Sequence, residues 1–218
     1  MKNFRTVFKA SEAELHISKS RFIGYAKPVE DENDAIRFIE KIKKQHWNAT
    51  HNVPVYVLGE NYDIQRYSDD GEPSGTAGIP ILEMLKKEGL TDVCIVITRY
   101  FGGVKLGTGG LVRAYTQSAK AALEAAIIVE KKVFVLLRLT VAYHFHGKLQ
   151  NYFMGEPQII LKDTQYTDYI TLEIYVQPDD EARITDHIVE LTAGQIDIEN
   201  GGAFYLTIKE GVVVEAKA

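Results

Sequence analysis

Residues 93–126 read VCIVITRYFGGVKLGTGGLVRAYTQSAKAALEAA, and the interpretation of the whole chain starts from this stretch. Its first five residues form a continuous apolar run, which predicts a strand buried on both faces. A glycine-rich loop follows at 102–110. From about Thr108 to Ala126 the apolar residues recur at helical spacing. The stretch therefore predicts a strand, a loop and a long helix, in that order.

The predicted helix has an apolar face and a polar face. The apolar face consists of Leu111, Val112, Tyr115, Ala119, Ala122 and Leu123. The polar face consists of Arg113, Gln117, Lys120 and Glu124. With Arg99 and Lys105 close by in sequence, this face predicts a basic patch beside the glycine-rich loop. The alternative interpretation is an ordinary solvated helix face.

Glycines are concentrated around this stretch, with nine of the 17 between positions 71 and 110. Eight of these nine fall in two loops, 68–78 and 99–110, and each loop precedes a predicted helix. Backbone N–H groups at a helix start can bind an anion, and glycine lets a ligand approach the backbone closely. The alternative is that the glycines only allow tight packing between strand and helix.

Familiar nucleotide-binding motifs do not fit the second loop. Gly102 and Gly107 have the spacing of a P-loop, but Thr108 stands where that motif requires lysine. Gly107 and Gly109 begin a G-x-G-x-x-G pattern that Val112 breaks. The sequence supports neither an ATPase nor a dinucleotide site, and we predict no cofactor.

The loop at 68–78 is acidic. Asp69, Asp70 and Glu72 are candidate metal ligands or acid–base groups, although their spacing does not match an EF-hand. The alternative is an acidic loop that caps the following helix through Ser74 or Thr76.

The histidines and the single cysteine give weaker functional signals. His51 is a candidate functional group, with a hydrogen-bonded structural histidine as the alternative. His144 and His146 form a pair at a predicted strand end, which is a weak metal signal. Cys94 lies inside the apolar run and is predicted to be a small core residue.

Outside this central stretch the pattern changes at about residue 132. Before it we expect strands at 4–8, 21–26, 53–58 and 63–67, and helices at 31–46 and from about Ala77. After it we expect strands at 134–143, 158–162, 167–176, 196–198 and 203–208, and helices at 144–154 and 179–192. The second set has the order βαββαβ of a ferredoxin-like fold. We therefore predict an α+β protein with domains at 1–132 and 133–218.

Charge is divided unevenly between these two domains. Residues 1–132 have 19 Lys and Arg against 17 Asp and Glu, and residues 133–218 have 6 against 13. The net charges are therefore +2 and −7, so a nucleic-acid partner would bind the first domain. The single cysteine, the absence of an apolar signal segment and the short apolar runs predict a cytoplasmic protein without a membrane partner.

The chain resembles the Impact family, also called the YigZ family. The resemblance is carried by Thr50-His51-Asn52, by 68–78, and by Ile81-Leu82, Leu85, Leu90, Val96-Ile97, Arg99-Tyr100-Phe101-Gly102-Gly103 and Leu106-Gly107. It implies a ribosomal protein S5 domain 2-like N-terminal domain and a ferredoxin-like C-terminal domain. It also implies a role in regulating translation, described for the family in the amino-acid-starvation kinase pathway. Both domains are similar to parts of elongation factor G, which is an analogy of fold only.

The main hypothesis is a non-enzymatic, translation-associated protein whose N-terminal domain binds RNA, the ribosome or a translation factor. The predicted anion- or nucleic-acid-binding residues are Arg99, Tyr100, Gly102, Gly103, Lys105, Gly107, Thr108, Gly109, Gly110 and Arg113. A second candidate site consists of His51, Asp69, Asp70, Glu72, Ser74 and Thr76. Two alternatives remain: a metal-dependent enzyme acting on a phosphorylated small molecule, and a protein-binding adaptor that uses the acidic C-terminal domain.

Overall fold

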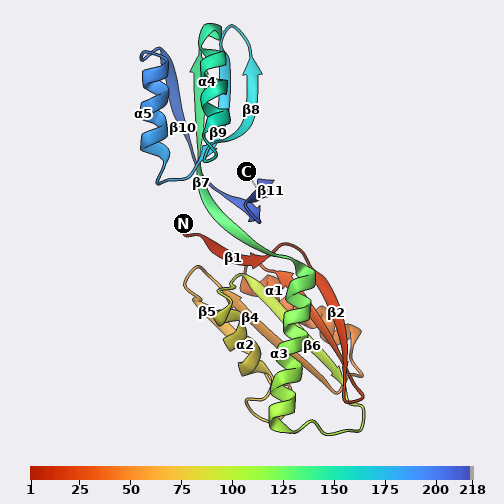
Figure 1. Cartoon of the computed structure of the whole chain (residues 1–218). Helices are drawn as coiled ribbons and strands as arrows, with labels where there is room; N and C mark the ends of the chain where they lie inside the picture. Colours follow the sequence, from red (N-terminus) through yellow and green to blue (C-terminus); the bar gives the residue numbers. More distant parts are fainter. Residues whose placement is uncertain (217–218) are drawn as a thin grey trace. The chain divides into compact units, whose positions relative to one another are not determined.

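The computed structural model describes residues 1–216, and it divides the chain into two units, 1–131 and 132–218. We call them the N-terminal and the C-terminal domain and describe each by itself (Figure 1). Both combine an antiparallel sheet with helices. The predicted α+β class is therefore confirmed, and so is the ferredoxin-like order β7-α4-β8-β9-α5-β10 of the second domain.

The N-terminal domain contains a five-stranded antiparallel sheet and three helices. Its sheet has the order β2-β3-β6-β4-β5, formed by Ser11–Ile17, Ser20–Pro28, Val93–Tyr100, His51–Leu58 and Ile64–Tyr67. Its helices are α1 (Glu32–Gln45), α2 (Gly78–Lys87) and α3 (Gly107–Ala126). A further strand, β1 (Phe4–Val7), pairs with the first residues of β7.

The apolar run at the centre of the sheet is buried because helices cover both of its faces (Figure 1). Val93, Ile95 and Ile97 pack in the core that contains α2 and α3. Cys94 and Val96 face the other way, toward α1. Alternate side chains of one strand point to opposite faces, so a strand between two helical layers must be apolar at every position. The prediction that Cys94 is a core residue is confirmed.

Helix α1 has the end signals that the sequence predicts. The Asp31 carboxylate accepts a hydrogen bond from the backbone N–H of Asp34 at 2.6 Å, and Lys43 and Lys44 occupy the last turn. The capping acceptor satisfies a free N–H group at the start, and the cations interact favourably with the helix dipole at the end, so both stabilise the helix. In α2, Pro80 lies in the first turn, where proline is tolerated.

The C-terminal domain is a second antiparallel sheet with two helices. Its strand order is β11-β10-β7-β9-β8, formed by Val212–Ala216, Ile196–Lys209, Ile128–Val141, Ile170–Val176 and Ile160–Tyr166. Helices α4 (Tyr143–Gly155) and α5 (Glu181–Leu191) pack on one face of it through Phe145, Leu149, Ile184 and Ile188.

Three details differ from the sequence prediction. Strand β2 is not among the predicted strands, although Ala13, Leu15 and Ile17 alternate with polar residues. The predicted strands 196–198 and 203–208 are one strand, β10. His144 and His146 lie in the first turns of α4 and not at a strand end. Of the helices that residues 1–216 form, none has both the length and the apolar composition needed to cross a membrane.

Candidate functional site

The glycine-rich loop connects the end of β6 to the start of α3, and it leaves the start of this helix open. Gly107 begins the helix with a φ of +70°, a conformation that favours glycine. The residue before it, Leu106, provides no side-chain cap, and the first turn contains no acidic residue. A Cβ added at Gly103, Gly107 or Gly109 would meet no atom within 4 Å. The backbone here is therefore accessible to a ligand.

Gly102 has a different role, because it packs against the turn between β2 and β3. A Cβ at Gly102 would lie 1.8 Å from the carbonyl oxygen of Lys19, so only glycine fits. The Gly102 N–H also donates to the Ser20 hydroxyl at 3.3 Å. This contact brings Lys19, which the sequence analysis did not identify, next to the glycine-rich loop. The sequence alone does not indicate which residue a tightly packed glycine contacts.

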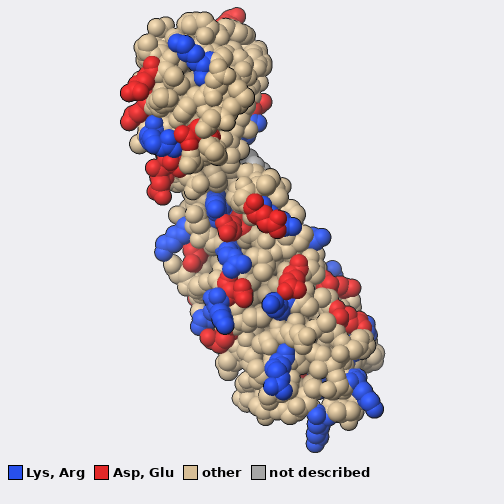
Figure 2. Space-filling model, in the orientation of Figure 1, with Lys and Arg blue, Asp and Glu red and all other residues tan. Residues whose placement is uncertain are grey.

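Three exposed cations lie in α3, in the loop before it or in the turn that packs on this loop: Lys19, Lys105 and Arg113. Among the described residues, none of the three forms an ion pair. Segments 18–21 and 101–113 contain one further cation, Arg21, which pairs with Glu14, and they contain no Asp or Glu. Figure 2 shows Lys and Arg without neighbouring Asp or Glu in this view, at the end of the domain where α3 begins. We call Lys19, Lys105, Arg113 and the exposed start of α3 the basic end.

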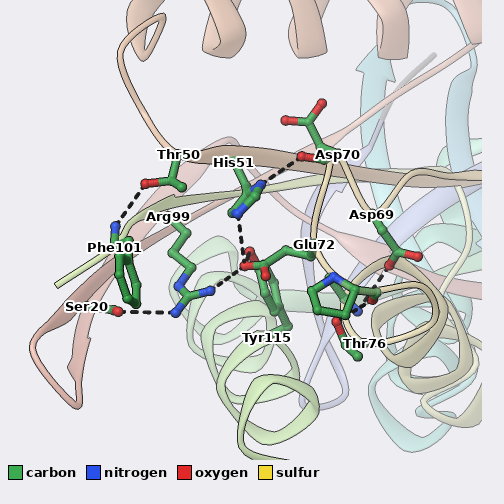
Figure 3. Close-up of polar contacts among 12 residues, drawn as sticks. Ser20, Thr50, His51, Asp69, Asp70, Glu72, Thr76, Arg99, Phe101 and Tyr115 are labelled. Atoms are coloured by element: carbon green, nitrogen blue, oxygen red, sulfur yellow. Dashed lines mark hydrogen bonds and ion pairs between the residues drawn. The ribbon is translucent and has the colours of Figure 1, made fainter. Parts of the chain in front are cut away.

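Arg99 does not belong to the basic end, which corrects the prediction that it contributes to the basic patch. Its side chain is buried, and its Nη1 donates to Glu72 Oε1 at 2.6 Å. Its Nη2 donates to Ser20 at 3.3 Å (Figure 3). Its guanidinium carbon lies 5.3 Å from the ring centroid of Phe22 and 5.4 Å from that of Phe101. As placed in the structure, Arg99 has no free face for a phosphate.

Tyr100 also turns away from the glycine-rich loop. Its hydroxyl contacts Nδ1 of the buried His46 at 2.8 Å on the α1 side of the sheet, while Tyr25 contacts Nε2 of the same ring at 2.6 Å. Burial lowers the pKa of His46 below its ordinary 6.5. Of the other predicted loop residues, Thr108 is exposed and Gly110 is half-buried.

Glu72 is the centre of a buried polar network. Besides Arg99, its Oε1 accepts a hydrogen bond from the Tyr115 hydroxyl at 2.7 Å, and its side chain is 3% exposed (Figure 3). Burial, and then the hydrogen bond to Glu72, raise the pKa of Tyr115. The network connects the acidic loop to β6 and α3, the two elements that the glycine-rich loop joins.

His51 lies between this network and the acidic loop. Its Nδ1 is 2.8 Å from the carbonyl oxygen of Asp70, and a carbonyl only accepts, so Nδ1 carries the proton. Its Nε2 lies 3.7 Å from Glu72 Oε1 (Figure 3).

The acidic loop is organised by hydrogen bonds within the protein. Asp69 accepts from the backbone N–H groups of Gly75, Ala77 and Gly78 at 2.8–3.1 Å, so it caps the start of α2. The predicted caps are corrected by this finding: Ser74 is exposed, and the Thr76 hydroxyl donates to the Pro73 carbonyl.

Asp70 has protein partners of its own. Its carboxylate accepts from the Asn52 N–H at 2.7 Å and from Lys43 at 3.1 Å. Asp69, Asp70 and Glu72 thus each point to different donors. In the described part of the chain, no three His, Cys, Asp or Glu side chains are grouped as a metal would require.

Both domains match known families. Residues 18–123 match the model of the Impact N-terminal domain, and residues 139–195 match a domain of unknown function (DUF1949). The chain is 47% identical over 204 residues to IMPACT family member YvyE of Bacillus subtilis, which covers 94% of each chain. It is 31% identical over 196 residues to IMPACT family member YigZ of Escherichia coli, which covers 89% of this chain and 92% of that relative.

Two further comparisons extend this picture. The Protein IMPACT homolog of Dictyostelium discoideum is 36% identical over 93 residues, which are 41% of this chain and 26% of that protein. A solved structure, described as the crystal structure of a hypothetical protein, superposes with a TM-score of 0.58 at 26% identity. The superposition covers 91% of this chain and 97% of that one.

Proposed function

Because the chain belongs to the IMPACT family, we propose that it is a non-enzymatic, cytoplasmic, translation-associated protein that binds RNA through its N-terminal domain. The observation that supports RNA binding is the basic end. There an uncapped helix start is flanked by Lys19, Lys105 and Arg113, with no acidic residue in the two segments that form it. RNA within the ribosome, or RNA bound to a translation factor, would present the same phosphates.

Each part of the basic end suits a phosphate. The first N–H groups of a helix have no partner within the helix, and the helix dipole favours a negative group there. Lysine and arginine on either side add charge that displaces the counterions of the nucleic acid. The whole chain has a net charge of −5, so any such attraction must be local and strongly weakened by salt.

The test is charge reversal at the basic end. Lys105→Glu and Arg113→Glu should each weaken RNA binding at least several-fold, and each should reduce the slope of log Kd against log salt by about one. Both side chains are exposed, so the fold should be unaffected. Binding is measured by fluorescence anisotropy of a labelled RNA between low and physiological salt.

Lys148→Glu is the matched control, because Lys148 is an exposed cation on α4 of the acidic domain. It should change neither the affinity nor the salt slope. If the two N-terminal reversals also leave both quantities unchanged, the basic end is an ordinary solvated surface and the proposal is wrong.

A further inference from the structure

Phe101 is an aromatic side chain held in place at the surface. It follows β6 directly and its side chain is 46% exposed. One side of the ring faces the Arg99 guanidinium, 5.4 Å from the ring centroid, and its N–H donates to the Thr50 hydroxyl at 3.0 Å (Figure 3). Arg99 is itself fixed by Glu72 and Ser20. The ring thus has a supported face and a face open to solvent.

The surroundings of this ring are cationic. Phe101 begins the segment that includes Lys105, and its neighbour Gly102 packs on the backbone of Lys19. Val104, which precedes Lys105 directly, is a second exposed apolar residue of this loop. An open aromatic face beside cations is complementary to a base with phosphates on both sides.

Phe101 differs from Trp47, another exposed aromatic residue of the domain, in the contacts that hold its ring in place. Trp47 is more exposed, at 82%, but no ring or cation contact involving it is seen among the described residues. Isolated apolar side chains on a surface are common and need no explanation. A ring whose orientation is fixed by a buried cation loses little further entropy when a second planar group stacks on it.

We propose that Phe101 is a stacking platform for an unpaired base of single-stranded RNA, with the flanking phosphates on Lys19 and Lys105. This inference rests on the proposed RNA binding and names the form of RNA that is bound. Base faces are accessible in a single strand, whereas in a duplex neighbouring base pairs cover them. The site therefore prefers single-stranded RNA over a duplex of equal length.

The test compares three probes with the full-length protein. They are an oligouridylate of about twelve nucleotides, an RNA duplex of the same length, and an abasic phosphodiester chain of the same length. Phe101→Leu should weaken oligouridylate binding about 5- to 100-fold, because base stacking on an aromatic ring is lost. The same variant should bind the abasic chain as the wild type does, because that chain has charge and no bases.

Two further variants show whether stacking is the cause. Phe101→Tyr keeps the aromatic face and should keep the affinity for oligouridylate, and Trp47→Leu should have no effect. Lys105→Glu should weaken binding of all three probes. Amide hydrogen exchange of each variant verifies that the N-terminal domain is folded.

The inference is overturned if Phe101→Leu binds oligouridylate as tightly as the wild type while Lys105→Glu does not. That result would support the proposed RNA binding and contradict base stacking on Phe101. It is also overturned if Phe101→Leu weakens oligouridylate and abasic binding equally, since the ring would then only position the loop. If the wild-type protein binds none of the probes, the proposed function and this inference both fail.

Discussion

Glu72 in the N-terminal domain and Glu173 in the C-terminal domain each accept hydrogen bonds from two side chains, in very different surroundings. Glu72 is bound by Arg99 at 2.6 Å and by Tyr115 at 2.7 Å, and all three side chains are buried. Glu173 is bound by Arg138 and Lys162, both at 2.8 Å, and these two cations are 40% and 34% exposed.

The difference shows that burial, more than distance, decides what such a contact contributes. At the surface, water replaces a lost partner, and an ion pair contributes little to stability. In the interior no water takes its place, so removing one partner leaves an uncompensated charge. The buried pair also orients groups at the protein surface, because Arg99 supports Phe101.

The largest expected difference in stability comes from removing the arginine that pairs with each glutamate, Arg99 with Glu72 and Arg138 with Glu173. Arg99→Ala should lower the free energy of unfolding of the N-terminal domain by about 3–5 kcal/mol. Arg138→Ala should lower that of the C-terminal domain by about 1 kcal/mol or less. Hydrogen exchange followed by mass spectrometry reports on peptides of each domain separately. Equal losses in the two domains would contradict the comparison.

A smaller loss is expected when only the neutral partner of Glu72 is removed. Tyr115→Phe keeps the ring and its edge-on contact with Phe22, but it deletes the hydroxyl that donates to the carboxylate. A hydrogen bond to a charged group contributes about 1.5–3 kcal/mol, so we expect a loss of that size in chemical denaturation. Tyr175→Phe in the C-terminal domain is the control. A loss as small as the control's would mean that the Glu72 network is not energetically coupled to Tyr115.

Asp69 in the acidic loop is half-buried, so it tests whether the contribution of a polar contact depends on burial. Asp69→Ala removes an acceptor for three backbone N–H groups and should destabilise the N-terminal domain by about 1–2 kcal/mol. Ser74→Ala should change stability by less than about 0.5 kcal/mol, because Ser74 is exposed. Thermal unfolding of both variants decides between the two residues as the cap of α2. If Ser74→Ala were the more damaging change, the capping role would return to Ser74.

The smallest expected effect is a difference in pH dependence. Burial lowers the pKa of His46, so its contribution to stability is present above pH 6.5 and is lost as the pH falls through the folded-state pKa. Hydrogen bonds from Lys162 and Arg138 lower the pKa of Glu173, so its contribution is lost only as the pH falls below 4.5. As the pH falls from about 7 to 5, protonation of His46 lowers the stability of the N-terminal domain. Over the same range Glu173 does not change the stability of the C-terminal domain.

The measurement compares the wild type with His46→Gln, by hydrogen exchange at pH 7 and pH 5. Burial raises the pKa of Asp92, which acts in the opposite direction, but Asp92 is present in both proteins and cancels in the difference. The wild type should lose more stability than the variant on acidification. An identical pH dependence of the two proteins would show that His46 does not cause the loss of stability on acidification.

Much of the fold follows from local sequence patterns. The apolar run of β6, the end signals of α1 and the βαββαβ order of the second domain all depend on residues close together in the chain. The errors have local causes as well. Gly201 and Gly202 interrupt the apolar pattern of β10 without ending the strand, and Gly202 has a φ of +97°.

The candidate site was less predictable, because its geometry depends on contacts between distant residues. Arg99 is buried only because Glu72, 27 residues earlier in the chain, lies beside it. Lys19 joins the basic end only because Gly102 packs on its backbone carbonyl. Residue types and spacing suggested an anion site near the start of α3, but no single-sequence pattern indicates which cation lies inside and which lies outside.

The single cysteine of the chain has a practical consequence. Cys94 has no exposed surface in β6, and burial raises the pKa of its thiol. Alkylating reagents attack the thiolate, which here is both inaccessible and scarce. Labelling therefore requires the sheet to open at β6. The rate of alkylation of the unaltered protein therefore measures how often the N-terminal sheet opens at β6.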